Sequence, residues 1–148
     1  MIHGVDELLA LPGTRLGPSR AVRVDQDQIT AFAEATEDRQ WIHVDRERAA
    51  AGPFGQTIAH GYLTLSLCSH FLEELLDVRD VSMAVNYGTD RVRFPSPVPV
   101  DAELVAAGEV ISAQEVDGAV QSKIRITIAI PEATKPACVA DVLIRHYA

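Results

Sequence analysis

The sequence contains little cysteine, few aromatic residues and no long apolar run. Its 148 residues include two cysteines, Cys68 and Cys138, and aromatic residues make up 5%. Neither cysteine has a partner at the spacing of a metal site, so we expect two buried thiols in a reducing compartment. No apolar segment reaches the about 20 residues that span a bilayer, and the N-terminus lacks the basic and apolar regions of a signal peptide. The sequence therefore predicts a cytoplasmic protein that does not enter the membrane.

The chain also lacks an excess of positive charge. Its formal net charge is −8, which argues against a surface for nucleic acids or anionic membranes. A local basic patch around one phosphorylated ligand stays compatible with this charge. Apolar residues make up 47%, which is enough for a sizeable core. From this length we expect one domain that covers residues 1–148.

The first half of the chain carries helical patterns. Asp25 and Asp45 stand where helix N-caps belong, and Gln28 follows Asp25 by three residues, as in a capping box. The segment 61–76 is apolar nearly all round for its first three turns, which is typical of a helix buried on most sides. The pattern predicts a strand at 20–24, helices at 5–11, 26–36, 46–51 and 61–76, and loops at 37–44 and 54–61.

The second half changes to the period of two residues that strands show. Isoleucines alternate with polar residues between 123 and 130, and Asp117-Gly118 is a favourable hairpin turn. The pattern predicts strands at 82–94, 102–116, 123–130 and 137–148, with an extended proline-rich bridge at 95–100. A single helix that is apolar nearly all round needs a surface that surrounds it. We therefore predict the α+β class and the hot-dog fold, a curved antiparallel sheet wrapped around a central buried helix.

Two proton-handling side chains, Asp38 and His43, lie five positions apart in the predicted loop at 37–44. They suit a catalytic acid/base pair, but equally a loop in which Asp38 turns the chain and His43 packs beside Trp41. Gly61 begins the predicted central helix, where unpaired backbone N–H groups attract a ligand oxygen and a glycine lets it approach closely. Chain geometry alone would also explain this glycine.

Other chemistries find no matching pattern. His43, His60 and His70 lack the spacing of a metal-binding motif, and we expect the His60 ring to bond to loop backbone. Motifs of serine hydrolases and of phosphate-binding loops are absent. We therefore predict neither a metal nor a cofactor.

Two segments resemble a known family. The sequence FAEATEDRQWIHVDRERAAAGPFGQTIAHGYLTLSL (32–67) resembles the hydratase motif of the MaoC-like (R)-specific enoyl-CoA hydratases and dehydratases. The sequence NYGTDRVRFPSPVPVDAEL (86–104) is similar to the family's strand with R-F-x-x-P-V. Where the common motif has Gly, Asn and Pro, this chain has Glu37, Gln40 and Trp41. The tryptophan resembles a subgroup related to nodulation protein N.

The resemblance implies a reaction and a set of residues. Asp38 and His43 match the family's catalytic pair, and Gly61 matches the glycine whose N–H helps to form the oxyanion hole. Gln40 and Trp41 then belong to the substrate-binding part of the motif. The implied reaction is the reversible hydration of a trans-2-enoyl-CoA to the (3R)-hydroxyacyl-CoA in fatty-acid metabolism.

Two further expectations concern the ligand and the assembly. Arg91 and Arg93 share one face of a strand and are candidates to meet the CoA phosphates, although many surface arginines are simply solvated. Free sheet edges favour a homodimer.

Two alternative functions stay open. A hot-dog acyl-CoA thioesterase usually needs a carboxylate on the central helix, which has none before Glu73. A non-catalytic subunit of a heteromeric dehydratase would not need both Asp38 and His43.

Overall fold

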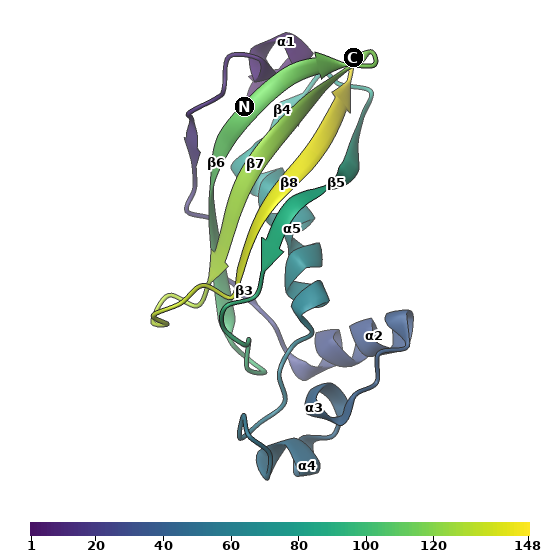
Figure 1. Ribbon diagram of the computed structural model, residues 1–148, viewed down its shortest axis with the longest axis vertical. Helices are drawn as coiled ribbons and strands as arrows, with labels where there is room; N and C mark the ends of the chain where they lie inside the picture. The colour runs from purple at the N-terminus through teal and green to yellow at the C-terminus, as the bar shows by residue number, and fades with distance from the viewer.

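The computed structural model describes all 148 residues and shows a curved sheet with one long helix along one side (Figure 1). The helices are α1 (Gly4–Leu8), α2 (Gln26–Thr36), α3 (Trp41–Val44), α4 (Arg46–Ala50) and α5 (Gly61–Leu75). The strands are β1 (Ile2–His3), β2 (Arg15–Leu16), β3 (Val22–Arg23), β4 (Val78–Arg79), β5 (Met83–Arg93), β6 (Glu103–Val116), β7 (Ala119–Ala129) and β8 (Cys138–Tyr147). Both termini lie at one end of the molecule, and α2, α3 and α4 lie at the other.

The four long strands form the predicted antiparallel sheet. The strand order is β2-β6-β7-β8-β5, and β3 pairs with β6 outside this path. Asp117 and Gly118, both with positive φ, turn the chain between β6 and β7, as their sequence predicts. β7 begins at Ala119, four residues before the predicted strand. β5 is an edge strand whose register shifts on both sides of Gly88.

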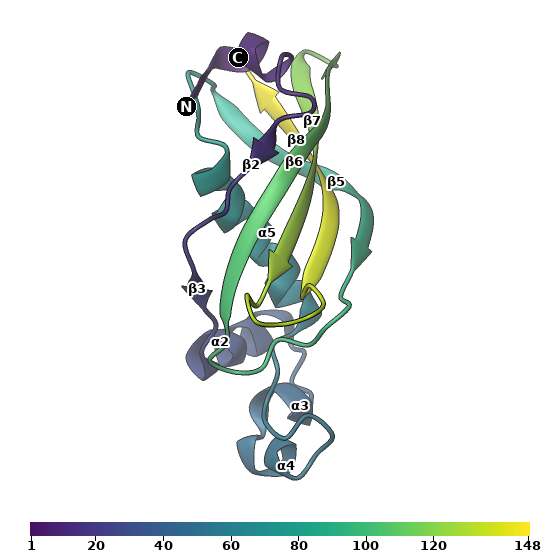
Figure 2. The ribbon, with the colours of Figure 1, turned by 90° about the vertical axis from the view of Figure 1, so that its left-hand side faces the viewer.

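The core lies between the sheet and α5, which confirms the α+β class and the hot-dog fold (Figure 2). The buried face of α5 consists of Leu63, Thr64, Leu67, Cys68, Phe71 and Leu72. Both cysteines are buried thiols, as expected. The prediction that α5 is buried on most sides is wrong for one stripe, which contains Tyr62, Ser66, Ser69 and His70. The stripe is exposed, and so is β5 along nearly its whole length.

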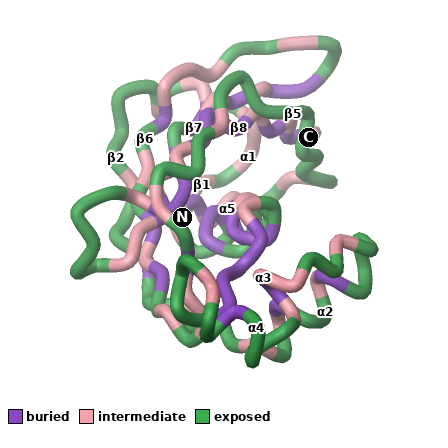
Figure 3. The backbone as a smooth tube through the Cα atoms, turned by 60° about the horizontal axis from the view of Figure 1, so that its bottom comes forward, coloured by how far each residue is buried: buried purple, intermediate pink, exposed green.

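Three short helices follow one another at the end of the sheet where α5 begins. The Asp25 side chain accepts from the Gln28 N–H and caps α2, and the Asp45 side chain accepts from the Arg48 N–H and caps α4. Both caps confirm the sequence prediction. The predicted loop at 37–44 is wrong over its second half, since residues 41–44 form the single turn α3. Figure 3 shows residues 57–60, which lead from α4 into α5, as a buried segment.

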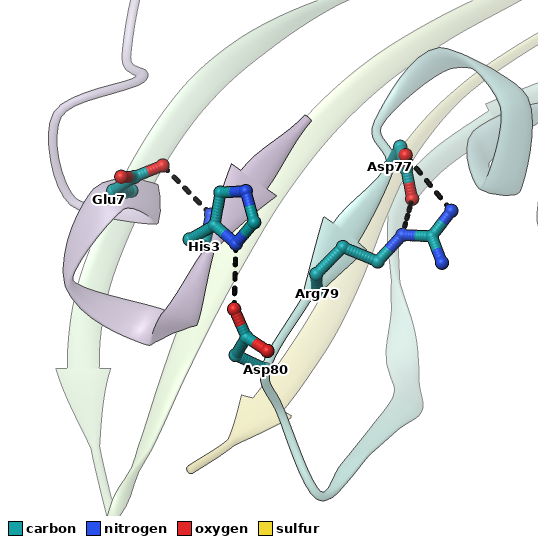
Figure 4. Close-up of polar contacts among 5 residues, drawn as sticks. All are labelled: His3, Glu7, Asp77, Arg79 and Asp80. Carbon is teal, nitrogen blue, oxygen red and sulfur yellow. Dashed lines mark hydrogen bonds and ion pairs between the residues drawn. The ribbon is translucent and has the colours of Figure 1, made fainter.

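The N-terminal segment is joined to the segment that leaves α5. β1 and β4 form a parallel two-stranded ribbon that the sequence did not predict. Figure 4 shows that the His3 ring contacts the Asp80 carboxylate and that the Glu7 carboxylate accepts from the His3 N–H. α1 ends at Leu8, three residues before the predicted end. None of the helices in this structure is both long and apolar enough to cross a membrane.

Candidate active site

His43 is held on α3 by the segment that precedes α5. Its Nδ1 lies 2.7 Å from the carbonyl oxygen of Ile58, and the Ile58 N–H donates to the Ile42 carbonyl. Because the Ile58 carbonyl can only accept, the His43 Nδ1 carries the hydrogen. The neutral ring therefore presents Nε2 as an unprotonated acceptor, which is the form that a general base requires.

The half-buried Gln26 side chain fixes α3 from a second direction. Its Nε2 donates to the His43 carbonyl at 2.8 Å, and its Oε1 accepts from the Thr57 hydroxyl at 2.6 Å. Thr57 is 1% exposed. One side chain of α2 thus joins α3 to the segment before α5. Gln26 and Thr57 are not among the residues predicted from the sequence, because no local pattern marks a contact between residues that are 31 positions apart.

Asp38 is brought next to His43 by the turn that ends α2. Glu37 has the left-handed φ of 61°, and it stands where the family motif has glycine, the residue that adopts this conformation most readily. One polar side-chain atom each of Asp38, His43 and His60 lies within 4.8 Å of the others. Asp38 is more accessible to solvent than the two buried histidines. The structure therefore combines the predicted acid/base pair in one place.

The environment keeps His43 neutral. Burial lowers the pKa of His43 below its ordinary value of 6.5, and the nearby His60 ring acts in the same direction. The hydrogen bond to Ile58 and the Asp38 carboxylate oppose this effect on the pKa but do not overcome it. Near neutral pH the ring is thus free to accept a proton.

Gly61 is the first residue of α5 and follows the N-cap residue His60. Its N–H, as the first N–H group of a helix of 15 residues, has no acceptor within the helix and lies at the positive end of the helix dipole. A Cβ at Gly61 would come within 3.0 to 3.2 Å of three ring atoms of Phe94. The exposed ring of Tyr62 contacts the same phenyl ring edge-on. This contact supports the explanation by chain packing, whereas the approach of a ligand oxygen rests on the position of Gly61 at the helix N-terminus.

Gln40 and Trp41 lie beside the pair but point to different surroundings. Gln40 is exposed and is the N-cap residue of α3, although its side chain makes no capping bond. The Trp41 ring packs on α4: the Arg48 guanidinium lies 4.4 Å from its centre, and Gly52 leaves room for its edge. Trp41 therefore anchors α3 to α4, and it remains partly exposed.

Arg91 and Arg93 do share one face of β5, opposite Asp141 and Val139 of β8. Both are exposed. Asp141 already pairs with Arg125 at 2.7 Å, and this guanidinium holds the pKa of the Asp141 carboxyl below its usual range. Arg93 makes no ion pair, and its one hydrogen bond goes to the carbonyl of the preceding Val92. The Arg93 charge is therefore available to a ligand.

The cluster of Asp38, His43 and His60 does not fit a metal chelate. The two imidazole rings are stacked with their centres 3.8 Å apart and their planes 22° from parallel. The lone pairs of nearly parallel rings lie in separate planes and do not converge at metal-ligand distance. Each ring also contacts a backbone carbonyl through one nitrogen.

Comparisons with known proteins show the family and the fold. The signature of the MaoC like domain matches residues 7–130. The chain is 43% identical to 3-hydroxyacyl-thioester dehydratase Z of Mycobacterium tuberculosis over 147 residues, which cover 99% of this chain and 97% of the relative. It is 44% identical to nodulation protein N of Rhizobium leguminosarum bv. viciae over 133 residues, which cover 87% and 82% of the two chains.

Solved structures show the same fold. The (R)-hydratase from A. caviae involved in PHA biosynthesis superposes with a TM-score of 0.70 and 26% identity, covering 90% of this chain and 94% of the other. A chain of the HadBC complex, a 3R-hydroxyacyl-ACP dehydratase from Mycobacterium tuberculosis, gives a TM-score of 0.75 at 19% identity, with 91% and 96% covered. The chain therefore belongs to the MaoC-like family, in the subgroup related to nodulation protein N.

Proposed function

We propose that this protein is an (R)-specific enoyl-CoA hydratase, which adds water across a trans-2-enoyl-CoA and also catalyses the reverse dehydration. The observation that carries this proposal is the meeting of Asp38 with a neutral, backbone-oriented His43 within 4.8 Å. Family membership supports the coarser function, a hydratase or dehydratase of acyl thioesters in fatty-acid metabolism. We propose that the protein performs this role in the cytoplasm.

In the proposed mechanism, Asp38 and His43 hold one water molecule between them. The water oxygen bonds to C3 while one of its protons passes to the pair, and the C2–C3 π electrons move toward the thioester carbonyl. The Gly61 N–H stabilises the negative charge that develops on the carbonyl oxygen, and one such donor is typically worth about 10²–10³ in rate. A proton from the pair then reaches C2 on the same face. Because the two groups share one water, their titrations are coupled.

The remaining candidates form the proposed surroundings of the substrate. Arg91 and Arg93 supply positive charge for the CoA phosphates. Gln40 and Trp41 lie in the chain between Asp38 and His43. Gln40 is exposed and Trp41 is partly exposed, so both can contact a substrate bound at the pair. The mechanism requires no metal or organic cofactor, because the water is activated by side chains alone.

A hot-dog thioesterase is the second candidate, and the placement of carboxylates argues against it. α5 has no carboxylate in its first turns, and Glu73 is exposed at the opposite end of the helix. Glu73 lines a cavity of about 670 Å³ there, together with Ser69, Asn86 and His146. None of the residues Asp38, His43 and Gly61 lines this cavity, so Glu73 lies apart from the candidate active site.

The deciding experiment is an assay of the purified protein with crotonyl-CoA. We expect hydration to (3R)-hydroxybutyryl-CoA, identified by chiral analysis, at a rate that a chelator does not change. Release of free CoA thiol instead of hydration would favour the thioesterase. Hydration only after a second subunit is added would favour the non-catalytic partner of a heteromeric dehydratase. A (3S) product would reject the proposed mechanism.

We further propose that the protein forms a homodimer through β5 and the exposed stripe of α5. Five large apolar side chains are exposed on α5, on β5 or directly after β5. They are Tyr62, Met83, Val85, Tyr87 and Phe94. β5 also offers the unpaired backbone groups of an 11-residue edge strand. A second copy that pairs along this edge would cover the apolar side chains and the stripe together.

A further inference from the structure

His60 is the one residue of the cluster to which the proposed mechanism gives no role. It is 3% exposed and is the residue directly before Gly61. Its ring makes no capping bond to α5. The reason for a buried imidazole at this place must therefore lie in its other contacts.

The first contact is with the main chain of Asp38. His60 Nε2 lies 2.9 Å from the Asp38 carbonyl oxygen, so this nitrogen carries a hydrogen and donates it. The sequence analysis predicted a bond from this ring to loop backbone, and the structure confirms it. Nδ1 is buried without any hydrogen-bond partner. A hydrogen on Nδ1 would be an unsatisfied buried donor, so the geometry places the ring hydrogen on Nε2.

The second contact is with His43. The two rings are stacked with their centres 3.8 Å apart. The ring of Phe32, on α2, packs against the His60 ring with 4.8 Å between the ring centres. The charged or titratable groups that face His60 are thus the His43 ring and the Asp38 carboxylate. Two positive rings in this stack would repel strongly, because burial weakens the screening between them.

We propose that His60 is a positioning residue of the hydratase site, which holds the main chain of Asp38 in place relative to His43 and Gly61. One ring joins the three parts of the site: the turn after α2 through its hydrogen bond, α3 through the stack, and the start of α5 through the chain itself. This inference rests on the proposed function and extends it to a residue outside the predicted catalytic set.

Two neutral substitutions separate the hydrogen bond from simple packing. In His60→Gln the amide nitrogen reaches about as far as Nε2, so it still donates to Asp38. In His60→Asn the amide stops at the position of Nδ1 and cannot reach. With crotonyl-CoA we expect kcat to stay within about threefold of wild type for Gln and to fall by about 10- to 100-fold for Asn, with KM little changed in both. His3→Gln, at an exposed histidine of β1, is the matched control and should leave kcat and KM unchanged.

A second readout does not depend on activity. Nitrogen NMR of the wild-type protein should show the hydrogen of the His60 ring on Nε2, as its hydrogen bond to the Asp38 carbonyl requires. Equal kcat in the Gln and Asn variants, or His60 protonated on Nδ1, overturns the proposal. A wild-type protein that does not hydrate crotonyl-CoA rejects the function, and NMR then still decides the state of His60.

Discussion

The phenyl ring of Phe94 lies directly against the backbone of Gly61, at the start of α5. A Cβ at position 61 would come within 3.0 Å of the ring atom Cδ2, so even alanine requires the ring to move. The glycine thus lets the chain after β5 close over the helix N-terminus. In the proposed mechanism, the same absence of a side chain lets the thioester oxygen approach the first N–H of α5.

These two roles of Gly61 separate in a double mutant. We expect Gly61→Ala to lower both the melting temperature and kcat, the latter by about 10-fold or more. Adding Phe94→Ala removes the clash, so Gly61→Ala should no longer lower the melting temperature in this background, but it should still lower kcat. Full recovery of kcat relative to Phe94→Ala alone would show that the glycine serves packing only. Thermal unfolding and the crotonyl-CoA assay give the two readouts.

The proposed acid/base pair predicts a non-additive loss. Asp38→Asn and His43→Gln should each lower kcat by about 10²-fold or more while the circular dichroism spectrum stays unchanged. Because both side chains act on one water, the double mutant should lose much less than the product of the two single losses. Near-wild-type activity in either single mutant would contradict the assignment.

The pH dependence follows from the buried state of His43. Its pKa is lowered in the folded protein, so the neutral form persists to pH values below the ordinary 6.5. We expect the acidic limb of kcat/KM to lie below this value, with activity lost as pH falls through the limb and retained as pH rises toward neutrality. The measurement is a pH profile with crotonyl-CoA. An acidic limb at or above pH 6.5 would mean that burial does not lower the pKa of the catalytic base.

Arg93 is predicted to bind the phosphates of CoA. Arg93→Ala should raise KM for the enoyl-CoA with little change in kcat, since a contact made equally in the ground and transition states is lost. Arg79→Ala is the matched control, because this arginine lies on β4 and is already paired with Asp77. An unchanged KM in Arg93→Ala, at low and at moderate salt, would assign the phosphates to another basic group.

The proposed dimer can be broken at one side chain. Val85→Asp places a charge in the middle of the exposed apolar surface of β5 and should convert the dimer into a folded monomer, detected by light scattering. Ala107→Asp introduces the same charge at an exposed position of β6 and should leave the dimer intact. A wild-type protein that is monomeric at micromolar concentration would exclude the homodimer.

The periodic elements could be predicted from the sequence, because each follows from a repeated local preference. Alternating isoleucines placed β7, and an apolar helical run placed α5, although this run could not show that one stripe stays uncovered. The single turn α3 has no such repeat. It forms because Gln26 and Ile58 bind it from other parts of the chain. Tertiary contacts of this kind decide short helices more than propensity does.

The sequence named candidate residues for the site but could not give their arrangement. The motif identified Asp38, His43 and Gly61, whereas the stacking of His60 on His43 and the ring of Phe94 beside Gly61 arise only in the folded chain. Glu37 is a middle case. The family motif has glycine at this position, and the structure shows that glutamate here adopts the left-handed φ that glycine adopts most readily.

Trp41 is the only tryptophan of the chain, and it lies two residues from His43. Its indole is partly exposed and contacts the Arg48 guanidinium, so its environment depends on how α3 and α4 sit together. Intrinsic fluorescence excited selectively at tryptophan therefore reports on this one corner of the molecule and on nothing else. Stopped-flow mixing with acyl thioesters can follow binding at the site in the unlabelled protein, without a probe that would disturb the residues around it.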